Sequence, residues 1–254
     1  MTVRKIFLII CFVVMLPGTS FSQTVTVAAA ANLQPVFSKL KIAFEKENPL
    51  IVVEAVFGSS GKLMAQIENG APFDIFLSAD MKYPEVLYRD GFSLQPPRVY
   101  AYGVLVLWSV RESDLAKGMN ILIDPRIRKI ALADPQVSPF GSQAMKAIRY
   151  YKLSDAVENK IVLGESIGQV NDFISSASAD VGFTSKSTVL SPDLKEKGVW
   201  VKIPLESYDR IAQGAVILKH AQALSEKGAQ KFYDFLFSQN AKDVLKRSGY
   251  LVDE

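Results

Sequence analysis

The sequence predicts an α/β protein of two lobes, each a mixed, mostly parallel sheet flanked by helices. Short β-rich runs alternate with amphipathic helical stretches along most of the chain, which is typical of parallel strands covered on both faces. The 254 residues exceed one typical domain of about 100–150 residues. The alternation is also interrupted twice, as expected where a chain crosses between two lobes.

Nine short runs rich in β-branched and aromatic residues are predicted strands. They are residues 24–30, 51–57, 74–77, 102–108, 129–133, 160–164, 180–183, 199–203 and 214–218. Helical patterns lie between them, and the first places Leu33, Phe37, Leu40 and Phe44 on one face. The strand and helix order therefore favours parallel sheets over an all-β or all-α fold.

The two interruptions lie near the middle and the end of the chain. A proline-rich stretch at 92–98 precedes a long strand at 99–109, and Ile203-Pro204 leads into another long strand at 211–218. Two long strands around a middle segment predict a hinge with two crossovers. We expect one lobe of residues 24–101 plus 214–254 and a second lobe of residues 102–213.

Residues 1–22 read as a secretory signal peptide. Arg4 and Lys5 precede an apolar run at 6–17, and Ser20-Phe21-Ser22 has the small-x-small pattern of a cleavage site. The run is too short to span a bilayer. A lipid anchor at Cys11 is the alternative, but bulky Ile10 and the apolar residues beyond Cys11 favour cleavage.

Cleavage changes the charge and the cysteine content. It removes Arg4, Lys5 and Cys11, which leaves 27 Lys and Arg against 26 Asp and Glu and no cysteine. The mature chain therefore has no disulfide and no thiolate metal site. Its near-neutral charge predicts no nucleic-acid partner. We also expect no direct cation ligands, because the candidate aspartates stand singly, without His or Cys nearby.

Four segments share one pattern: a buried strand, then small or flexible residues, then a helix. They are residues 28–33, 57–62, 134–142 and 164–169. The first turn of a helix has N–H groups without internal partners, so it is a ready anion site. Any one segment alone reads as an ordinary cap or turn. Four together predict an oxyanion site with neutral donors, including the Asn32 and Ser60 side chains.

A hydrolase is the enzymatic alternative for Ser59-Ser60-Gly61. A serine nucleophile needs a base and an orienting group, and the chain has a single histidine, His220. We expect His220 on the surface, far from the strand-end loops. A Ser-Lys pair with Lys62 stays open, although Lys62 fits a solvated helix flank better.

Four stretches of the chain resemble the periplasmic molybdate/tungstate-binding proteins of ABC transporters, in order and over essentially all of the mature chain. The stretches are 27–33, 58–61 with 66–80, 133–141 and 179–183. The most family-specific part is Gly70-Ala-Pro-Phe-Asp-Ile-Phe-Leu-Ser-Ala-Asp80. The resemblance implies the class II periplasmic binding protein fold, with an oxyanion enclosed between the lobes.

The resemblance also implies a ligand set. Carried over by position, the ligands are Asn32, Ser60 and the backbone at Phe140 and Ile167. Weaker candidates are Ala31, Ser59, Gly141, Gly168 and Ser185. Some relatives add a tyrosine hydroxyl at the position that Ser185 occupies here, so either Ser185 or Asn32 would replace that contact.

The expected function is therefore a soluble, monomeric periplasmic receptor without a cofactor. It would bind molybdate or tungstate, catalyse no reaction and deliver the anion to an ABC permease in the inner membrane. A receptor for another oxyanion such as sulfate is the alternative, and a hydrolase on the same fold is a further one.

Overall fold

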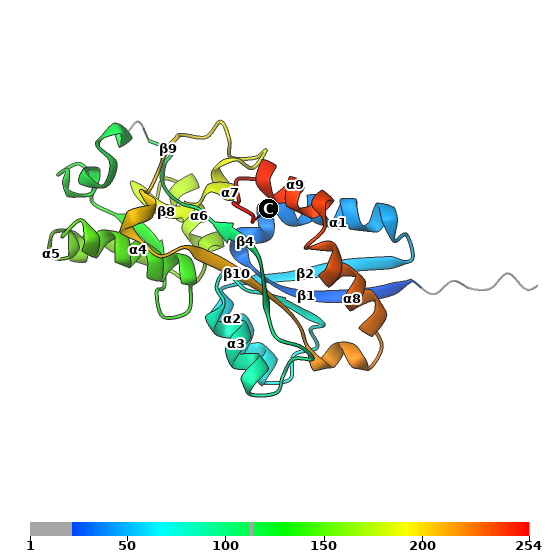
Figure 1. The fold of residues 1–254 in the computed structure, drawn as a ribbon. Helices are drawn as coiled ribbons and strands as arrows, with labels where there is room; N and C mark the ends of the chain where they lie inside the picture. Colours follow the sequence, from blue (N-terminus) through cyan, green and yellow to red (C-terminus); the bar gives the residue numbers. More distant parts are fainter. Residues whose placement is uncertain (1–21, 112–113, 254) are drawn as a thin grey trace, which may run out of the picture.

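The computed structural model describes residues 22–111 and 114–253. The predicted signal peptide lies outside them except for its last residue. Within the described part, no helix is long and apolar enough to cross a membrane. Two five-stranded sheets form two lobes side by side, and β4 and β10 run toward the junction between them (Figure 1). This confirms the predicted two-lobed α/β fold.

The first lobe holds both ends of the described chain. Its sheet has the order β2-β1-β3-β10-β4. Its elements are β1 (Gln23–Ala30), η1 (Ala31–Leu33), α1 (Gln34–Glu47), β2 (Ile51–Gly58), α2 (Ser60–Glu68), β3 (Ile75–Leu77), α3 (Lys82–Arg89), β4 (Arg98–Gly103), β10 (Ile211–Ile217), η5 (Lys219–Gln222), α8 (Glu226–Phe235) and α9 (Gln239–Arg247).

The second lobe is built from the middle of the chain, and its sheet has the order β7-β6-β8-β5-β9. Its elements are β5 (Leu105–Ser109), η2 (Leu115–Ile123), β6 (Ile130–Ala133), α4 (Pro139–Tyr150), α5 (Ser154–Val157), η3 (Glu158–Lys160), β7 (Ile161–Gly164), α6 (Ile167–Ser175), β8 (Val181–Ser185), α7 (Lys186–Val189), β9 (Val199–Lys202) and η4 (Leu205–Ser207).

Both sheets use one strand pattern. In the first, β1 pairs in parallel with β2 and β3, and β10 runs antiparallel to β3 and β4. In the second, β6 pairs in parallel with β7 and β8, and β5 runs antiparallel to β8 and β9. Each sheet is thus mixed and mostly parallel, as predicted. The antiparallel strand in each lobe is the one that enters from the other lobe.

The predicted long strand at 99–109 is two strands in different sheets. β4 ends at Gly103 and β5 begins at Leu105, so Val104 joins the lobes. The return crossing lies between β9 and β10, at 203–210. The change from one sheet to the other cannot be predicted from the sequence, because β-propensity is continuous along this segment. The strands that it pairs with are distant in the sequence. We propose Val104 and residues 203–210 as the hinge, so the second lobe comprises residues 105–202 rather than the predicted 102–213.

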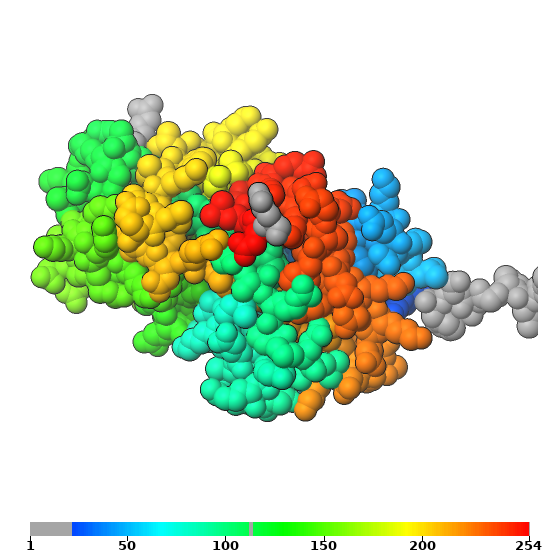
Figure 2. Space-filling model, viewed as in Figure 1, coloured from blue at the N-terminus to red at the C-terminus, as the bar shows by residue number. Residues whose placement is uncertain are grey.

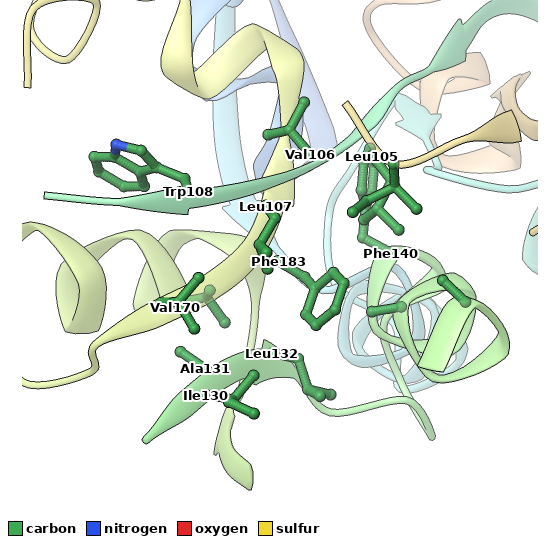
Figure 3. Close-up of a cluster of buried hydrophobic side chains, with 14 of the residues drawn as sticks. Leu105, Val106, Leu107, Trp108, Ile130, Ala131, Leu132, Phe140, Val170 and Phe183 are labelled. Atoms are coloured by element: carbon green, nitrogen blue, oxygen red, sulfur yellow. The ribbon is translucent and has the colours of Figure 1, made fainter. Parts of the chain in front are cut away.

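Each lobe has its own apolar core. In the first, the predicted face of α1 is buried, with Leu40 and Phe44 fully inaccessible. In the second, Phe140 of α4 packs toward Leu105 of β5 and Phe183 of β8 (Figure 3). Burying one such side chain contributes about 1.5–3 kcal/mol. The helix starts that follow the strands are therefore anchored by packed cores.

The C-terminal segment reaches the junction of the lobes. Leu251 forms an isolated antiparallel bridge with Tyr102 of β4. Figure 2 shows this segment, in red, lying where the two lobes meet. It thereby places the side chain of Tyr250 close to the crossing strands.

Candidate functional site

A small cavity lies between the lobes, where β1, β2, β6 and β7 end. Its volume is about 10 Å³. Its lining residues are Ala30, Ala31, Asn32, Gly58, Ser59, Ser60, Ala79, Ser138, Pro139, Phe140 and Ile167. The carboxyl ends of parallel strands are where α/β proteins bind ligands. All four helix starts singled out in the sequence meet at this cavity.

Two serines of the first lobe bring hydroxyl groups to the cavity. Ser60 is the first residue of α2, and its Oγ accepts a hydrogen bond from the Ala79 N–H at 3.0 Å. That contact occupies the oxygen and leaves the hydroxyl hydrogen available as a donor. Ser59 is 5% exposed, and its Oγ is buried without a hydrogen-bond partner. A buried polar atom without a partner is costly, and the Ser59 hydroxyl at this cavity could donate a hydrogen bond to an anion.

The second lobe offers main-chain donors at two helix starts. In α4, Pro139 fills the first position, and Ser138 accepts a hydrogen bond from the Gly141 N–H at 3.5 Å. In α6, Ser166 accepts one from the Gln169 N–H at 3.4 Å. These caps leave the N–H groups of Phe140 and Ile167 without partners among the described residues. Both residues line the cavity.

Gly141 has a steric role at this point. A Cβ built on it would overlap the carbonyl oxygen of Ala133, the last residue of β6. Only glycine therefore lets the first turn of α4 pack so closely on the strand. The position of the Phe140 N–H depends on that contact, whereas Gly141 itself is absent from the cavity lining.

The side chain of Asn32 is held from behind the cavity. Its Nδ2 donates to Gln213 Oε1 and to the Tyr250 hydroxyl, each at 3.1 Å. Its carbonyl oxygen accepts from Tyr250 at 2.7 Å and from Ser187 of the second lobe at 2.9 Å. Tyr100 also donates to Gln213 Oε1, at 2.8 Å. Both amide hydrogens are therefore used, and only the backbone of Asn32 is left for a ligand, contrary to the expected side-chain donor.

Burial has a marked effect on the two tyrosines of this network. It raises the pKa of Tyr100 well above the ordinary value for a tyrosine. Burial also raises the pKa of Tyr250, and hydrogen bonds with the side chains of Ser187 and Asn32 offset part of this rise. Both hydroxyls stay protonated at neutral pH, so both act as hydrogen-bond donors. No signal in the sequence marks Tyr250 or Gln213 as neighbours of Asn32.

Ser185 does not reach the cavity. Its Oγ accepts a hydrogen bond from the Thr188 N–H at 3.3 Å and lies 2.8 Å from the Ser187 hydroxyl, so it caps α7. Gly168 lines a larger neighbouring groove of about 580 Å³ instead, and Ala31 lines both spaces. Of the weaker candidates, the structure brings only Ala31 and Ser59 to the cavity.

The residues that line the cavity include no charged side chain. Lys62 and Glu165 stand beside it and pair with each other at 2.7 Å. His220 lies elsewhere, 2.9 Å from Asp74, so the view that Asp74 stands without a histidine nearby is wrong. Asp74 also accepts a hydrogen bond from the Ser225 hydroxyl. No group of three or more His, Cys, Asp or Glu suited to a metal occurs in the described residues.

Comparison with known proteins places the chain in a family. Residues 25–251 match the family described as bacterial extracellular solute-binding protein. The chain belongs to this family. Among individual solute-binding proteins, the molybdate-binding protein ModA of Azotobacter vinelandii is 33% identical over 227 residues, which cover 89% of each chain. The ModA protein of Rhodobacter capsulatus is 32% identical over 231 residues, or 90% and 88% of the two chains.

A solved structure of another solute-binding protein supports the same placement. The periplasmic molybdate-binding protein of Azotobacter vinelandii superposes with a TM-score of 0.83 at 33% identity. The match covers 91% of this chain and all of the other. The relatives are thus named as binding proteins, and the likeness extends over both lobes.

Proposed function

We propose that this protein is a periplasmic receptor that binds molybdate or tungstate and delivers it to an ABC permease. The observation that carries the proposal is the buried, unpartnered Ser59 hydroxyl at a small uncharged cavity. The Ser60 hydroxyl and the N–H groups of Asn32, Phe140 and Ile167 complete a set of neutral donors from both lobes. The names of the ModA relatives support the choice of anion.

Neutral donors suit a fully ionised tetrahedral anion. Burying a charged group is costly unless hydrogen bonds replace its water, and helix N-termini supply such bonds. A cavity of donors disfavours protonated phosphate, whose O–H would face another donor. Sulfate has no such proton, but its S–O bonds are shorter than the metal–oxygen bonds of molybdate and tungstate. It would stretch hydrogen bonds that are worth about 1.5–3 kcal/mol each.

The rest of the proposal follows from the fold. Donors from two lobes favour the closed state when the anion binds, and the closed form is the one we expect the permease to recognise. We propose that the mature receptor, residues 23–254 after signal cleavage, acts as a monomer and catalyses no reaction. The uncharged lining supports that view because it lacks an acid or base.

Calorimetric titration of the mature protein tests the choice of anion. We expect molybdate and tungstate to bind with similar affinity and sulfate at least about tenfold more weakly, which corresponds to one weakened charged hydrogen bond. Equal affinity for sulfate would contradict the proposed selectivity. Absence of binding for all three anions would contradict the proposed function as a whole.

Ser59→Ala tests the site itself. The hydroxyl makes no hydrogen bond within the described residues and its burial is costly, so its loss should not lower the free energy of unfolding. Affinity for molybdate should fall by about 1.5–3 kcal/mol, the value of a hydrogen bond to a charged group. Ser248→Ala is the matched control, because Ser248 Oγ is also buried without a partner but lies away from the cavity. Equal affinity in the Ser59 variant and wild type would place the site elsewhere.

A further inference from the structure

An exposed ion pair joins the two lobes at the edge of the cavity. Lys62 Nζ lies 2.7 Å from Glu165 Oε2, with the two side chains 47% and 71% exposed. Lys62 follows Ser60 by two residues in the first turn of α2, and Glu165 precedes Ile167 by two residues at the start of α6. The pair therefore links two of the helix starts that line the cavity, one from each lobe.

Helix preferences explain one member of the pair and not the other. A carboxylate near a helix N-terminus is favourable, which suits Glu165 before α6. A lysine in the first turn is unfavourable for the same reason, yet Lys62 occupies that place in α2. Neither side chain has a second ion-pair partner among the described residues. The position of Lys62 is thus accounted for by its contact across the lobes.

Two neighbouring hydrogen bonds span the same edge. The Gly61 N–H donates to the Val137 carbonyl at 2.9 Å, and the Tyr83 hydroxyl donates to the Gln136 carbonyl at 3.2 Å. In both, the donor belongs to the first lobe and the acceptor to the β6–α4 loop of the second. All three contacts need the lobes to be together, because separation of α2 and α3 from the second lobe breaks each of them.

We propose that Lys62 and Glu165 form a latch that slows release of the anion by favouring the closed state. The proposal rests on the proposed function and adds two residues that set affinity without touching the ligand. An interaction present only in the closed state raises the closed population by its own free energy. Exposed ion pairs typically change such an equilibrium by about two- to fivefold.

The negative charge of Glu165 also acts directly on the anion, and this effect on affinity is opposite in sign to that of the ion pair. A substitution of Glu165 therefore distinguishes the two. A carboxylate near an anion site repels the anion, so its neutralisation should tighten binding if repulsion dominates. Under the latch proposal, the same neutralisation should weaken binding, because it breaks the ion pair. Glu165→Gln keeps the size of the side chain and removes only its charge.

The experiment measures molybdate dissociation by stopped flow in the mature protein. We expect Glu165→Gln and Lys62→Gln each to raise the dissociation rate about two- to fivefold. The double variant K62E/E165K should return it toward the wild-type value. At about 1 M salt, where the Debye length is about 3 Å, all four proteins should converge. Arg126→Gln is the control, since its 2.8 Å pair with Asp124 lies within the second lobe.

Slower release from Glu165→Gln, or an unchanged rate in both single variants, would overturn the latch while leaving the proposed function intact. A wild type that binds no tested anion would overturn the proposed function. The latch is then judged by small-angle scattering of the ligand-free protein at low salt. Breaking the pair must increase the open fraction, and an unchanged scattering profile would overturn it.

Discussion

The cavity is held differently on its two sides. On the hinge side, Asn32 is fixed by buried hydrogen bonds to Gln213, Tyr250 and Ser187. At the rim, the lobes meet through three contacts at the starts of α2 and α3. The ion pair and the bond from Tyr83 are exposed. Buried bonds are costly to leave unmade, whereas exposed pairs exchange readily with water. We therefore expect the contacts on the hinge side to stay formed when the contacts at the rim break.

This difference separates two kinds of substitution. A change behind the cavity should alter the free energy of unfolding together with anion affinity, because those contacts exist with and without ligand. A change at the rim should alter affinity alone, since its contacts exist only in the closed state. Stability and affinity measured on the same variants therefore test whether the two sides differ as the structure indicates.

The largest effect is expected from Gly141→Ala, at a contact between α4 and β6 that lies within the second lobe and is present with and without ligand. The added Cβ overlaps the Ala133 carbonyl oxygen, so the first turn of α4 must move away from β6. Overpacking of this kind costs about 1–3 kcal/mol or more, and the Phe140 N–H moves with the helix. We expect a lower midpoint of thermal unfolding and almost complete loss of molybdate binding in calorimetry.

Gly168→Ala is the matched control for that variant. Gly168 also lies in the first turn of its helix, α6, directly after the cavity residue Ile167, but a Cβ there would make only ordinary contacts, the nearest at 3.4 Å from Ser166 Oγ. Its unfolding midpoint and affinity should stay close to wild type. Equal behaviour of the two alanine variants would show that the close approach of α4 to β6 is unimportant.

Gly61→Ala is the corresponding change at the rim. A Cβ on Gly61 would lie 2.9 Å from the Tyr83 hydroxyl and 3.0 Å from the Val137 Cα, which belongs to the other lobe. The open state avoids the second clash by separation, so the free energy of unfolding without ligand should change little. Affinity should fall by about 1–3 kcal/mol, the cost of overpacking in the closed state. A loss of stability equal to the loss of affinity would mean that the rim does not open.

The sequence predicted local features well. The two-lobed fold is confirmed, and the four helix starts that it singled out do meet at one cavity. Both depend on short-range signals, such as the apolar face of α1 or the Ser138-Pro139 pair that caps α4 and fills its first position. Register along β1 and β2 then places the ends of the strands side by side.

Contacts between distant segments could not be predicted from the sequence. Asn32 was expected to donate through its side chain, but that side chain is bound by Tyr250, 218 positions away. The break at Val104 was missed because the β-propensity of the segment is continuous across it. The ion pair between Lys62 and Glu165 joins two helix starts that are distant in the sequence, so no local pattern predicts it. In each case the deciding neighbour is set by tertiary packing rather than by local pattern.

The smallest effect at neutral pH is expected from Tyr100→Phe, which removes one hydrogen bond of the hinge-side network. Gln213 Oε1 keeps its bond from Asn32, so stability should fall by only about 1 kcal/mol.

At alkaline pH, the burial of the Tyr100 hydroxyl should affect the free energy of unfolding. Because the pKa of Tyr100 is raised in the folded state, the unfolded chain loses this proton first, above about pH 10. The folded state then binds more protons, and stability falls as pH rises from there toward the raised pKa, by up to about 1.4 kcal/mol per pH unit. Denaturant unfolding between pH 9 and 11 should show a shallower decline in Tyr100→Phe than in wild type, and parallel curves would mean that the hinge-side hydroxyl is open to water.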